Sequence, residues 1–599
     1  MNETHASSPR AEPFSAAQAV AAGTDFAELQ LGAHGLFWNE YRPEDAACRI
    51  WHWRDGLAKR LTPDGFSVRS RVYEYGGGAF CLTPDGVVFV NEADQQLYRQ
   101  ALDGAPVALT STDCRYGDLQ FAAGRVLAVE EQQDRHRLVA IDLATGTRQV
   151  LAEGADFYAS PTLSPDGQRL AWIEWSRPHQ PWTSTRLMVA EGEFSAPRCV
   201  AGEQIEESIQ QPRFDADGRL YCLTDRGGYW QPWVETSDGL HALPSAEADH
   251  APAPWQLGGC TWLPVGDQIL ASWSEAGFGR LALGSEDFSG DYSRFRHLAV
   301  DQQFIYCIAA SPVSPSAVIA IDRASHAVKV LAGGVAPLPA ERISRPQTLR
   351  YPSGSGEAHG FFYPSMSGEA KPPLVVFIHG GPTSACYPIL DPRIQYWTQR
   401  GFAVADLNYR GSSGYGREYR QALHLRWGEV DVEDACAVVG YLSGQGLIDG
   451  DRAFIRGGSA GGYTTLCALA FRKVFRAGAS LYGVSDPVAL ARATHKFEGD
   501  YLDWLIGDPE LDAERYAART PLLHADNIRV PMIFFQGELD AVVVPQQTRD
   551  MVTALEHNGI PVEAHYYPDE RHGFRRAANQ AHALEQEWTF YRRVMGLVD

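Results

Sequence analysis

The sequence predicts two domains of different class: a β-propeller, followed by a doubly wound α/β domain with a mostly parallel sheet. Three observations lead to this prediction. Short apolar runs separated by similar turns fill the first part of the chain, strand-like and helix-like runs alternate in the second part, and eleven of the fifteen tryptophans precede residue 280. We therefore expect an N-terminal segment over residues 1–25, a propeller over 26–344 and the α/β domain over 345–599.

The propeller prediction rests on a turn that recurs along the first part of the chain. Leu82–Gly86, Leu163–Gly167 and Phe214–Gly218 all end in Asp-Gly and precede an apolar run, as expected of a turn between two strands. The last two turns are 51 residues apart (218 − 167), close to one four-stranded blade. About 320 residues at about 45 to 50 per blade allow six to eight blades, of which we expect seven. The alternative is an irregular pair of β-sandwiches. Predicted strands include Val87–Val90, Arg125–Val129, Arg169–Ile173, Arg219–Leu223 and Gln268–Ser272.

The α/β prediction begins after residues 345–370, which are rich in Pro, Gly and Ser and predict the crossing between domains. Beyond them, continuous apolar runs indicate buried parallel strands with helices between them. The predicted strands are Pro373–Ile378, Phe402–Leu407, Ala453–Ile455, Ala477–Tyr482, Pro531–Phe535 and Val562–Tyr567, and the predicted helices are Asp431–Leu442, Pro545–His557 and Asn579–Met595.

The composition limits the partners and the compartment. Lys and Arg number 52 and Asp and Glu 74, so the net charge is −22, which argues against a nucleic acid or an anionic membrane surface as partner. With no secretory signal and no apolar run of about 18 residues, we expect a cytoplasmic protein without a membrane span. The ten cysteines form no C-x-x-C pair, so we expect reduced core thiols rather than a zinc or redox site.

A single G-x-S-x-G motif, Gly457–Gly461, lies between the predicted strand Ala453–Ile455 and a run of small residues with helical character, Tyr463–Ala470. A nucleophile elbow requires this strand–turn–helix context, because only glycine at the flanking positions lets the strand and the helix approach each other. The start of the helix also favours developing negative charge. The motif therefore predicts Ser459 as the nucleophile of an α/β-hydrolase domain.

A serine hydroxyl needs a base to take its proton, and α/β-hydrolases carry their triad in the chain order Ser, acid, His. Asp540 follows the predicted strand Pro531–Phe535, and His572 follows the strand Val562–Tyr567. We therefore predict Asp540 as the acid and His572 as the base. Competing candidates are Glu538 and Asp569 for the acid and His582 for the base.

An oxyanion hole needs two N–H donors. We expect one from Ala460, directly after the nucleophile, and the other from the loop Ile378–Pro382, with Gly381 preferred and Gly380 close behind. The alternative for this loop is a plain turn. The chain has no H-E-x-x-H, P-loop or G-x-G-x-x-G motif, so we expect neither a metal nor an organic cofactor.

Several segments of the second domain carry specific motifs, namely His379–Pro382, Asn408–Gly416, Trp427-Gly428 with Asp431–Asp434, Gly457–Gly462, and the loops of Asp540 and His572. With them the chain resembles, over nearly its whole length, the prolyl oligopeptidase family of serine peptidases. The resemblance implies a propeller over an α/β-hydrolase domain, catalysis by Ser459, Asp540 and His572, and restriction to short peptides. The His-Gly-Gly-Pro loop and Val72–Phe80 are similar to the acylaminoacyl-peptidase and bacterial aminopeptidase branch, including the puromycin-hydrolysing type.

The resemblance implies a serine exopeptidase that acts on the N-terminus of short peptides or small aminoacyl amides. Recognition of a free α-amine requires a carboxylate near the cleft. The candidates are Glu74, the pair Glu206 and Glu207, and Glu498. Dipeptidyl peptidases of the family use a glutamate pair from the propeller, whereas an acylaminoacyl-peptidase would need no such carboxylate.

Other readings remain open at this point. Arg410 and Asp486 are expected to brace loops of the hydrolase domain rather than to bind substrate. The same triad would also serve a carboxylesterase or amidase, and a propeller-based binding protein with an inactive hydrolase domain is a further alternative. Nothing in the sequence decides the oligomeric state, the side-chain preference, or whether one or two residues are released.

Overall fold

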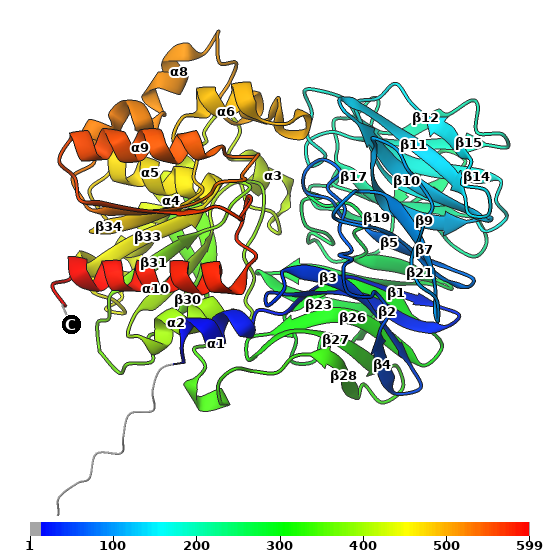
Figure 1. Ribbon diagram of the computed structural model, residues 1–599, viewed down its shortest axis with the longest axis horizontal. Coiled ribbons are helices and arrows are strands. Elements are labelled where there is room, and N and C mark those ends of the chain that lie inside the picture. The colour runs from blue at the N-terminus through cyan, green and yellow to red at the C-terminus, as the bar shows by residue number, and fades with distance from the viewer. Residues whose placement is uncertain (1–13, 598–599) are drawn as a thin grey trace, which may run out of the picture.

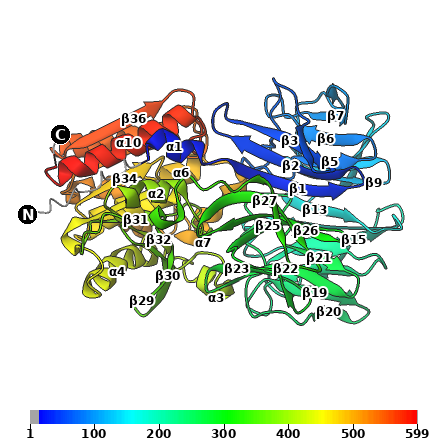
Figure 2. The ribbon, with the colours of Figure 1, turned by 90° about the horizontal axis from the view of Figure 1, so that it is seen from below.

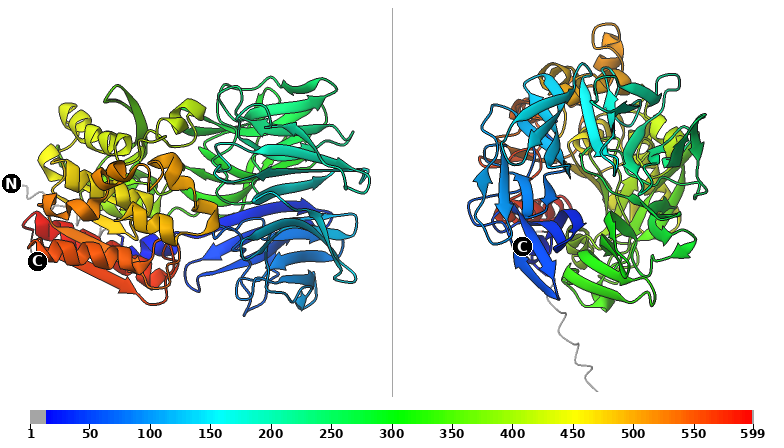
Figure 3. Two further views of the ribbon diagram at one scale, coloured as in Figure 1. Left: turned by 90° about the horizontal axis from the view of Figure 1, so that it is seen from above. Right: turned by 90° about the vertical axis from the view of Figure 1, so that its right-hand side faces the viewer.

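The computed structural model describes residues 14–597, in which a propeller stands beside an α/β domain (Figure 1). Residues 1–13 of the N-terminal segment expected over 1–25 lie outside the described residues, as do residues 598–599. Seven four-stranded sheets and one eight-stranded sheet hold the described strands. Figure 3 shows the two parts from above and from the propeller side.

Each four-stranded sheet is one propeller blade, made of four strands that follow one another in the chain. The predicted seven-bladed propeller is therefore confirmed. The ring closes where β1 of the first blade contacts β25 and β27 of the last. The strands of the seven blades are β1 (Asp25–Gly32), β2 (Gly35–Arg42), β3 (Ala47–Arg54), β4 (Leu57–Arg60); β5 (Phe80–Thr83), β6 (Gly86–Val90), β7 (Leu97–Ala101), β8 (Val107–Ala108); β9 (Arg115–Ala122), β10 (Arg125–Gln132), β11 (Arg135–Asp142), β12 (Arg148–Ala152); β13 (Phe157–Leu163), β14 (Arg169–Trp175), β15 (Arg186–Glu191), β16 (Arg198–Ala201); β17 (Ile209–Phe214), β18 (Leu220–Thr224), β19 (Gln231–Thr236), β20 (Gly239–Ala242); β21 (Trp262–Val265), β22 (Gln268–Glu275), β23 (Phe278–Leu283), β24 (Glu286–Asp287); β25 (Arg294–Val300), β26 (Phe304–Ser311), β27 (Ser314–Asp322) and β28 (Val328–Gly333).

The recurring Asp-Gly turns join the first strand of a blade to its second, as between β5 and β6. All five strands predicted in this region fall on second strands, such as β6 and β18. Every residue of β6 and β18 is buried, whereas every residue of the outer strand β4 is exposed. Continuous apolar runs therefore predict the inner strands of a blade. The outer strands are not predicted, because they are exposed to solvent and lack such a run.

The α/β domain contains the eight-stranded sheet, in the order β29-β30-β32-β31-β33-β34-β35-β36. The pairs from β32 to β36 are parallel, while β30 runs antiparallel to both β29 and β32. The predicted mostly parallel sheet is thus confirmed, and β36 has the predicted bounds. The strands are β29 (Gln347–Ser353), β30 (Gly356–Tyr363), β31 (Leu374–Ile378), β32 (Ala403–Asn408), β33 (Ala453–Gly458), β34 (Ala477–Leu481), β35 (Met532–Gly537) and β36 (Val562–Tyr567).

Helices cover both faces of this sheet. In Figure 1, α4, α5 and α9 lie above it and α2 and α10 below it. The segment from α6 to η4 connects β34 to β35 and reaches toward the propeller. The helices are α1 (Ala16–Ala21), α2 (Pro392–Gln399), α3 (Gly416–Gln421), α4 (Val430–Gly444), α5 (Ala460–Phe471), α6 (Pro487–Ala493), α7 (Tyr501–Leu505), α8 (Ala513–Ala518), α9 (Pro545–His557) and α10 (Ala577–Val594), with short 3-10 helices η1 (Ala340–Arg342), η2 (Gly450–Arg452), η3 (Lys496–Glu498) and η4 (Pro521–Asn527).

Two segments differ from their sequence-based reading. Residues 345–370, read as a domain crossing, contain the antiparallel strands β29 and β30. Helix α1 precedes the propeller in the chain but packs against α2 and α10 of the α/β domain (Figure 2). The α/β domain therefore includes residues that precede the propeller in the sequence as well as residues that follow it.

Arginines of α3 make the most deeply buried ionic contacts between the domains. Asp225 of the propeller, whose side chain is fully buried, accepts hydrogen bonds from Arg417 at 2.8 Å and from Arg420. Asp249 accepts from two backbone N–H groups at the start of α3, that of Gly414 in the preceding loop and that of Gly416 in the first turn. These contacts fix one side of the propeller on the α/β domain.

Within residues 14–597, no helix combines the length and the apolar character needed to cross a membrane. All ten cysteines lie in this part of the chain and are free thiols.

Candidate active site

Ser459 lies at the sharp turn between β33 and α5, with φ 54° and ψ −120°. A non-glycine residue holds such angles only where its surroundings impose them. A Cβ added to Gly457 would lie 2.3 Å from the backbone of Gly461, and one added to Gly461 would lie 2.1 Å from the carbonyl oxygen of Ile378. The flanking glycines thus allow the strand and the helix to pack closely and leave the serine side chain at the start of the helix.

The structure brings Ser459 together with two other residues predicted from the sequence. Nε2 of His572 lies 2.9 Å from Oγ of Ser459, and Nδ1 lies 2.8 Å from Oδ2 of Asp540. The residues come from three loops, which follow β33, β35 and β36. Parallel strands end at one edge of the sheet, so loops distant in sequence meet there.

Asp540 is held rigidly in this arrangement. Its side chain is fully buried, and its Oδ1 accepts hydrogen bonds from the backbone N–H groups of Val542 and Val543, each at 2.9 Å. These bonds leave Oδ2 directed at the imidazole of His572. A carboxylate fixed in this way can hold the ring in one tautomer and stabilise its protonated form.

The competing candidates have other partners. Glu538 forms an ion pair with Arg549, and Asp569 with Arg576. The ring of His582 is hydrogen-bonded to the hydroxyl of Tyr567. None of the three is bonded to Ser459 or His572 among the described contacts.

The loop Ile378–Pro382 passes beside the serine and is held from behind by His379. Its imidazole contacts the hydroxyl of Ser412 at 2.7 Å and stacks on Tyr409, and burial lowers its pKa to about 4, so the ring is neutral at physiological pH. The backbone N–H groups of Gly381 and Ala460 donate to no residue in the described part of the chain. Both residues line the space around Ser459, so both groups are free to bind an oxyanion there.

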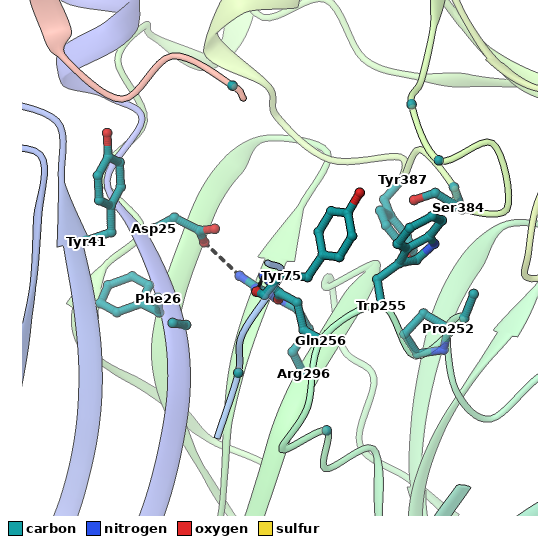
Figure 4. Close-up of a pocket in the computed structure, with 18 of the residues that line it drawn as sticks. Asp25, Phe26, Tyr41, Tyr75, Pro252, Trp255, Gln256, Arg296, Ser384 and Tyr387 are labelled. Carbon is teal, nitrogen blue, oxygen red and sulfur yellow. Dashed lines mark hydrogen bonds and ion pairs between the residues drawn. The ribbon is translucent and has the colours of Figure 1, made fainter. Parts of the chain in front are cut away.

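Both domains line a cavity of about 1140 Å³ that includes Ser459 and His572. Figure 4 shows Tyr75 and Trp255 of the propeller beside Ser384 and Tyr387 of the α/β domain. The indole N–H of Trp255 donates to the carbonyl of Thr383 at 2.6 Å, so the cavity wall is continuous across the domain boundary at this point.

A smaller cavity opens beside the nucleophile and is lined by Ser459, Ala460 and Gly381. Its wall is mostly apolar, and its volume of about 20 Å³ has room for about one water molecule, so it is a narrow recess beside the serine. One carboxylate lies in the wall, that of Glu498 in η3, and the Tyr75 hydroxyl donates a hydrogen bond to it. The apolar residues of the wall include Trp427, Val484, Leu490, Leu502, Leu505 and Val543.

The other predicted carboxylates face elsewhere. Glu74 pairs with Arg115 at 2.6 Å. The side chain of Glu207 is fully buried against Arg226, and that of Glu206 is 61% exposed and pairs with Arg417. None of the three lines either cavity.

Sequence reasoning missed Tyr75 and the apolar wall contributed by the segment from α6 to α7. Tyr75 adjoins Glu74 in the chain, but Tyr73 and Glu74 both have positive φ, near 58° and 68°, and this turn directs neighbouring side chains apart. Arg410 and Asp486 have structural partners, as expected, since Arg410 pairs with Asp434 and Asp486 caps α6. Among residues 14–597, no cluster of three or more His, Cys, Asp or Glu side chains could hold a metal.

Comparison with known proteins identifies the family. The model of the prolyl oligopeptidase family matches residues 388–598. Dipeptidyl aminopeptidase BIII of Pseudoxanthomonas mexicana is 33% identical over 217 residues, which are 35% of this chain and 32% of that protein. The chain thus spans about a third of the length of this curated relative.

Solved structures match the chain over nearly its whole length. The structure of a puromycin-hydrolysing peptidase from Mycobacterium tuberculosis is 34% identical, covers 98% of this chain and 97% of its own, and superposes with a TM-score of 0.93. A puromycin hydrolase is 32% identical with the same coverage and TM-score. The chain therefore belongs to the prolyl oligopeptidase family, and it is a serine peptidase.

Proposed function

We propose that this serine peptidase is an exopeptidase that hydrolyses short peptides or small aminoacyl amides from their N-terminus. The observation that carries the proposal is the hydrogen-bonded series Ser459, His572 and Asp540 at a cavity that both domains line. Similarity to puromycin-hydrolysing enzymes and to a dipeptidyl aminopeptidase supports action at a substrate N-terminus.

In the proposed reaction, Oγ of Ser459 attacks the scissile carbonyl carbon while Nε2 of His572 takes the hydroxyl proton. The oxyanion of the tetrahedral intermediate accepts hydrogen bonds from the N–H groups of Ala460 and Gly381. The C–N bond then breaks, and His572 gives its proton to the leaving amine, which leaves an acyl-enzyme. Water attacks the ester with His572 again as base, and collapse of the second intermediate restores the serine. Asp540 stabilises the imidazolium in both halves of the reaction.

The volume of the cavity and its position between the domains support a limit on substrate size. Ligand sites for small molecules typically occupy about 300 to 1,000 Å³, and the cavity here holds about 1140 Å³ between the two domains. A short peptide fits into such a volume, whereas a folded protein does not. Domain opening is the proposed route of entry.

The test of the proposed nucleophile is the Ser459→Ala variant, with Ser384→Ala as the matched control. Ser384 is a second serine on the wall of the same cavity. A fluorophosphonate probe should label the native protein and the Ser384 variant but not the Ser459 variant. We expect kcat on an aminoacyl anilide to fall by roughly 10⁴- to 10⁶-fold only in the Ser459 variant. Labelling that persists without Ser459 would contradict the proposal.

A substrate panel tests the exopeptidase activity. We expect turnover of anilides with a free α-amine and poor turnover of their N-acetyl counterparts and of internal peptide bonds. Preferred turnover of the N-acetyl series would instead identify an acylaminoacyl-peptidase, and preferred turnover of simple esters a carboxylesterase.

A further inference from the structure

Glu498 is the one carboxylate on the wall of the small cavity beside Ser459, within the described residues. It lies at the end of η3, and its side chain is only 11% exposed. Its Oε1 accepts a hydrogen bond from the hydroxyl of Tyr75, which reaches over from the propeller. The carboxylate therefore lies at a point where the two domains and the substrate space meet.

The hydrogen-bonding capacity of this carboxylate is far from filled. An ionised carboxylate can accept about four hydrogen bonds, yet in the described part of the chain no donor is bonded to Oε2 of Glu498. The nearest basic side chain among the described contacts is that of His495, whose Nε2 lies 3.8 Å from Oε1, beyond hydrogen-bonding distance. Other buried acids differ, since Glu207 and Asp225 each pair with an arginine. A carboxylate largely withdrawn from water and without a cation beside it is costly, so Glu498 is available to pair with a cation from the substrate.

Aromatic rings surround the same position. The ring centroid of Tyr75 lies 5.0 Å from that of Trp255 and 5.9 Å from that of Phe497, and Figure 4 shows Tyr75 and Trp255 together on the cavity wall. Ring faces attract an ammonium group, particularly where water is excluded. A carboxylate bordered by aromatic rings is the chemistry that recognises an amine.

The position of Glu498 also bears on which substrate residue carries this amine. Glu498, Ser459, Ala460 and Gly381 line one and the same cavity. In a substrate residue whose carbonyl carbon contacts Ser459, the α-nitrogen is only two bonds from that carbon, so it lies next to the wall that Glu498 shares with the serine. The amine of a dipeptidyl substrate would lie one residue, roughly 3.5 Å, further along an extended chain.

We propose that Glu498 binds the α-ammonium group of the residue being cleaved, with Tyr75 holding the carboxylate in place, so that the enzyme releases one N-terminal residue at a time. This assignment rests on the exopeptidase function proposed above and names its substrate class as unblocked aminoacyl amides and peptides. Glu498 acts in binding and specificity and takes no part in the proton transfers.

The experiment compares Glu498→Gln with the native enzyme on Leu-p-nitroanilide, its N-acetyl form and Gly-Leu-p-nitroanilide. Glu510→Gln is the matched control, since it makes the same change at an exposed glutamate of the same segment. We expect kcat/KM on Leu-p-nitroanilide to fall by roughly 10- to 100-fold in the Glu498 variant, the loss typical of a charge-assisted hydrogen bond. The N-acetyl substrate should be unaffected or cleaved faster, and the Glu510 variant should match the native enzyme.

A pH profile separates binding from a merely structural role. A substrate α-amine loses its proton near pH 8, so kcat/KM of the native enzyme on Leu-p-nitroanilide should decline above that pH more steeply than on the N-acetyl form. In the Glu498 variant this difference should disappear. The Tyr75→Phe variant, which keeps the ring, should show a smaller loss on the free amine alone.

Three results would overturn the assignment: equal loss on the free and N-acetyl substrates, no loss on either, or faster cleavage of Gly-Leu-p-nitroanilide than of Leu-p-nitroanilide by the native enzyme. A loss in Glu206→Gln on free-amine substrates would instead favour the propeller glutamates. These outcomes are distinct from failure of the triad proposal, which would appear as activity in the Ser459 variant.

Discussion

Asp540 shows how one residue depends on its hydrogen bonds. Two backbone N–H groups bind Oδ1, which leaves Oδ2 for His572. An asparagine would fit the same space, but its amide N–H₂ group would face either these donors or the imidazole Nδ1–H. In both orientations a donor would face a donor. No acceptor would then hold His572 in the tautomer that keeps Nε2 unprotonated toward Ser459.

We expect the Asp540→Asn variant to fold normally and to lose roughly 10⁴-fold in kcat at neutral pH. Steady-state kinetics on an aminoacyl anilide would measure the loss, and circular dichroism would verify the fold. Glu538→Gln serves as control, because Glu538 follows the same strand but pairs with Arg549. A loss of less than tenfold in the Asp540 variant would indicate that another group orients His572.

At the residue scale, the sequence was informative about Ser459, Asp540 and His572 because each follows a predicted buried strand in a fixed chain order. It was less informative about Glu498. This residue lies on a short 3-10 turn within an insertion, and its contact Tyr75 lies more than 400 residues earlier in the chain. Only the packing of the propeller on the α/β domain brings them together.

The turn between β33 and α5 is the element most sensitive to small changes. Substituting Gly461→Ala would place a methyl group 2.1 Å from the carbonyl oxygen of Ile378, too close without a shift of the backbone. We expect this variant to lose probe labelling at Ser459 and to melt at lower temperature in calorimetry.

In helix α4, a glycine-to-alanine substitution should have the opposite effect on stability. Gly440 is exposed in mid-helix, and an added Cβ would meet no atom within 4 Å. Alanine there should stabilise the protein by about 0.5 to 1 kcal/mol and leave probe labelling unchanged. If both glycine variants behaved alike, close packing at the turn would not be the cause.

Asp406 of strand β32 lines the larger cavity, and its pKa is unusually high for an aspartate. Burial, and next the charge of Asp391, raises the pKa of Asp406 to about 7. In the unfolded chain such a carboxyl ionises near pH 4. The folded state therefore retains a proton that the unfolded state has lost, and folding stability falls as pH rises from about 4 to 7 and is then constant.

We expect the Asp406→Asn variant to lose this part of the pH dependence. Its melting temperature relative to the native protein should be higher at pH 8 than at pH 5, as measured by calorimetry in matched buffers. An unchanged difference between the two pH values would show that Asp406 ionises normally in the folded protein.

Among elements, the parallel strands and their helices were predictable, and the antiparallel hairpin of β29 and β30 was not. The strand Val562–Tyr567 and the helix Pro545–His557 have the bounds expected from the sequence. Strands β29 and β30 were missed because Pro352, Gly354 and Gly356 give their hairpin the composition of a linker. In a hairpin at the sheet edge only alternate residues of β29 are buried, so no continuous apolar run marks it.

At the scale of the whole molecule, the ion pairs around Asp225 join the domains. Its carboxylate and the side chain of Arg420 are both buried, so removing the charge leaves this arginine with only the more distant carboxylate of Asp249, at 3.7 Å. We expect Asp225→Asn to weaken the domain contact by roughly 3 to 5 kcal/mol. Limited proteolysis should then cut the protein faster, whereas Asp267→Asn, at a fully exposed aspartate of the propeller, should change nothing. Equal cutting of both variants would place the stability of the contact elsewhere.

The net charge of −22 has a kinetic consequence if substrates are ammonium cations. An acidic protein attracts them over distances of about a Debye length, roughly 8 Å at physiological ionic strength. Raising the salt concentration should therefore increase KM for free-amine substrates and leave KM for N-acetyl substrates unchanged. A parallel change for both series would point to an effect of salt on the enzyme itself.

The docking of α1 on α2 and α10 gives the propeller two covalent attachments to the α/β domain, one before β1 and one after β28. A domain attached at two points can rotate about the axis through them but cannot separate from its partner. If substrate enters by the domain opening proposed above, that opening should be a rotation that keeps this side closed and separates the side where Asp225 contacts α3. Proteolytic cleavage of one of the two connections would leave the domains joined by the other. It would change the axis of rotation without releasing either domain.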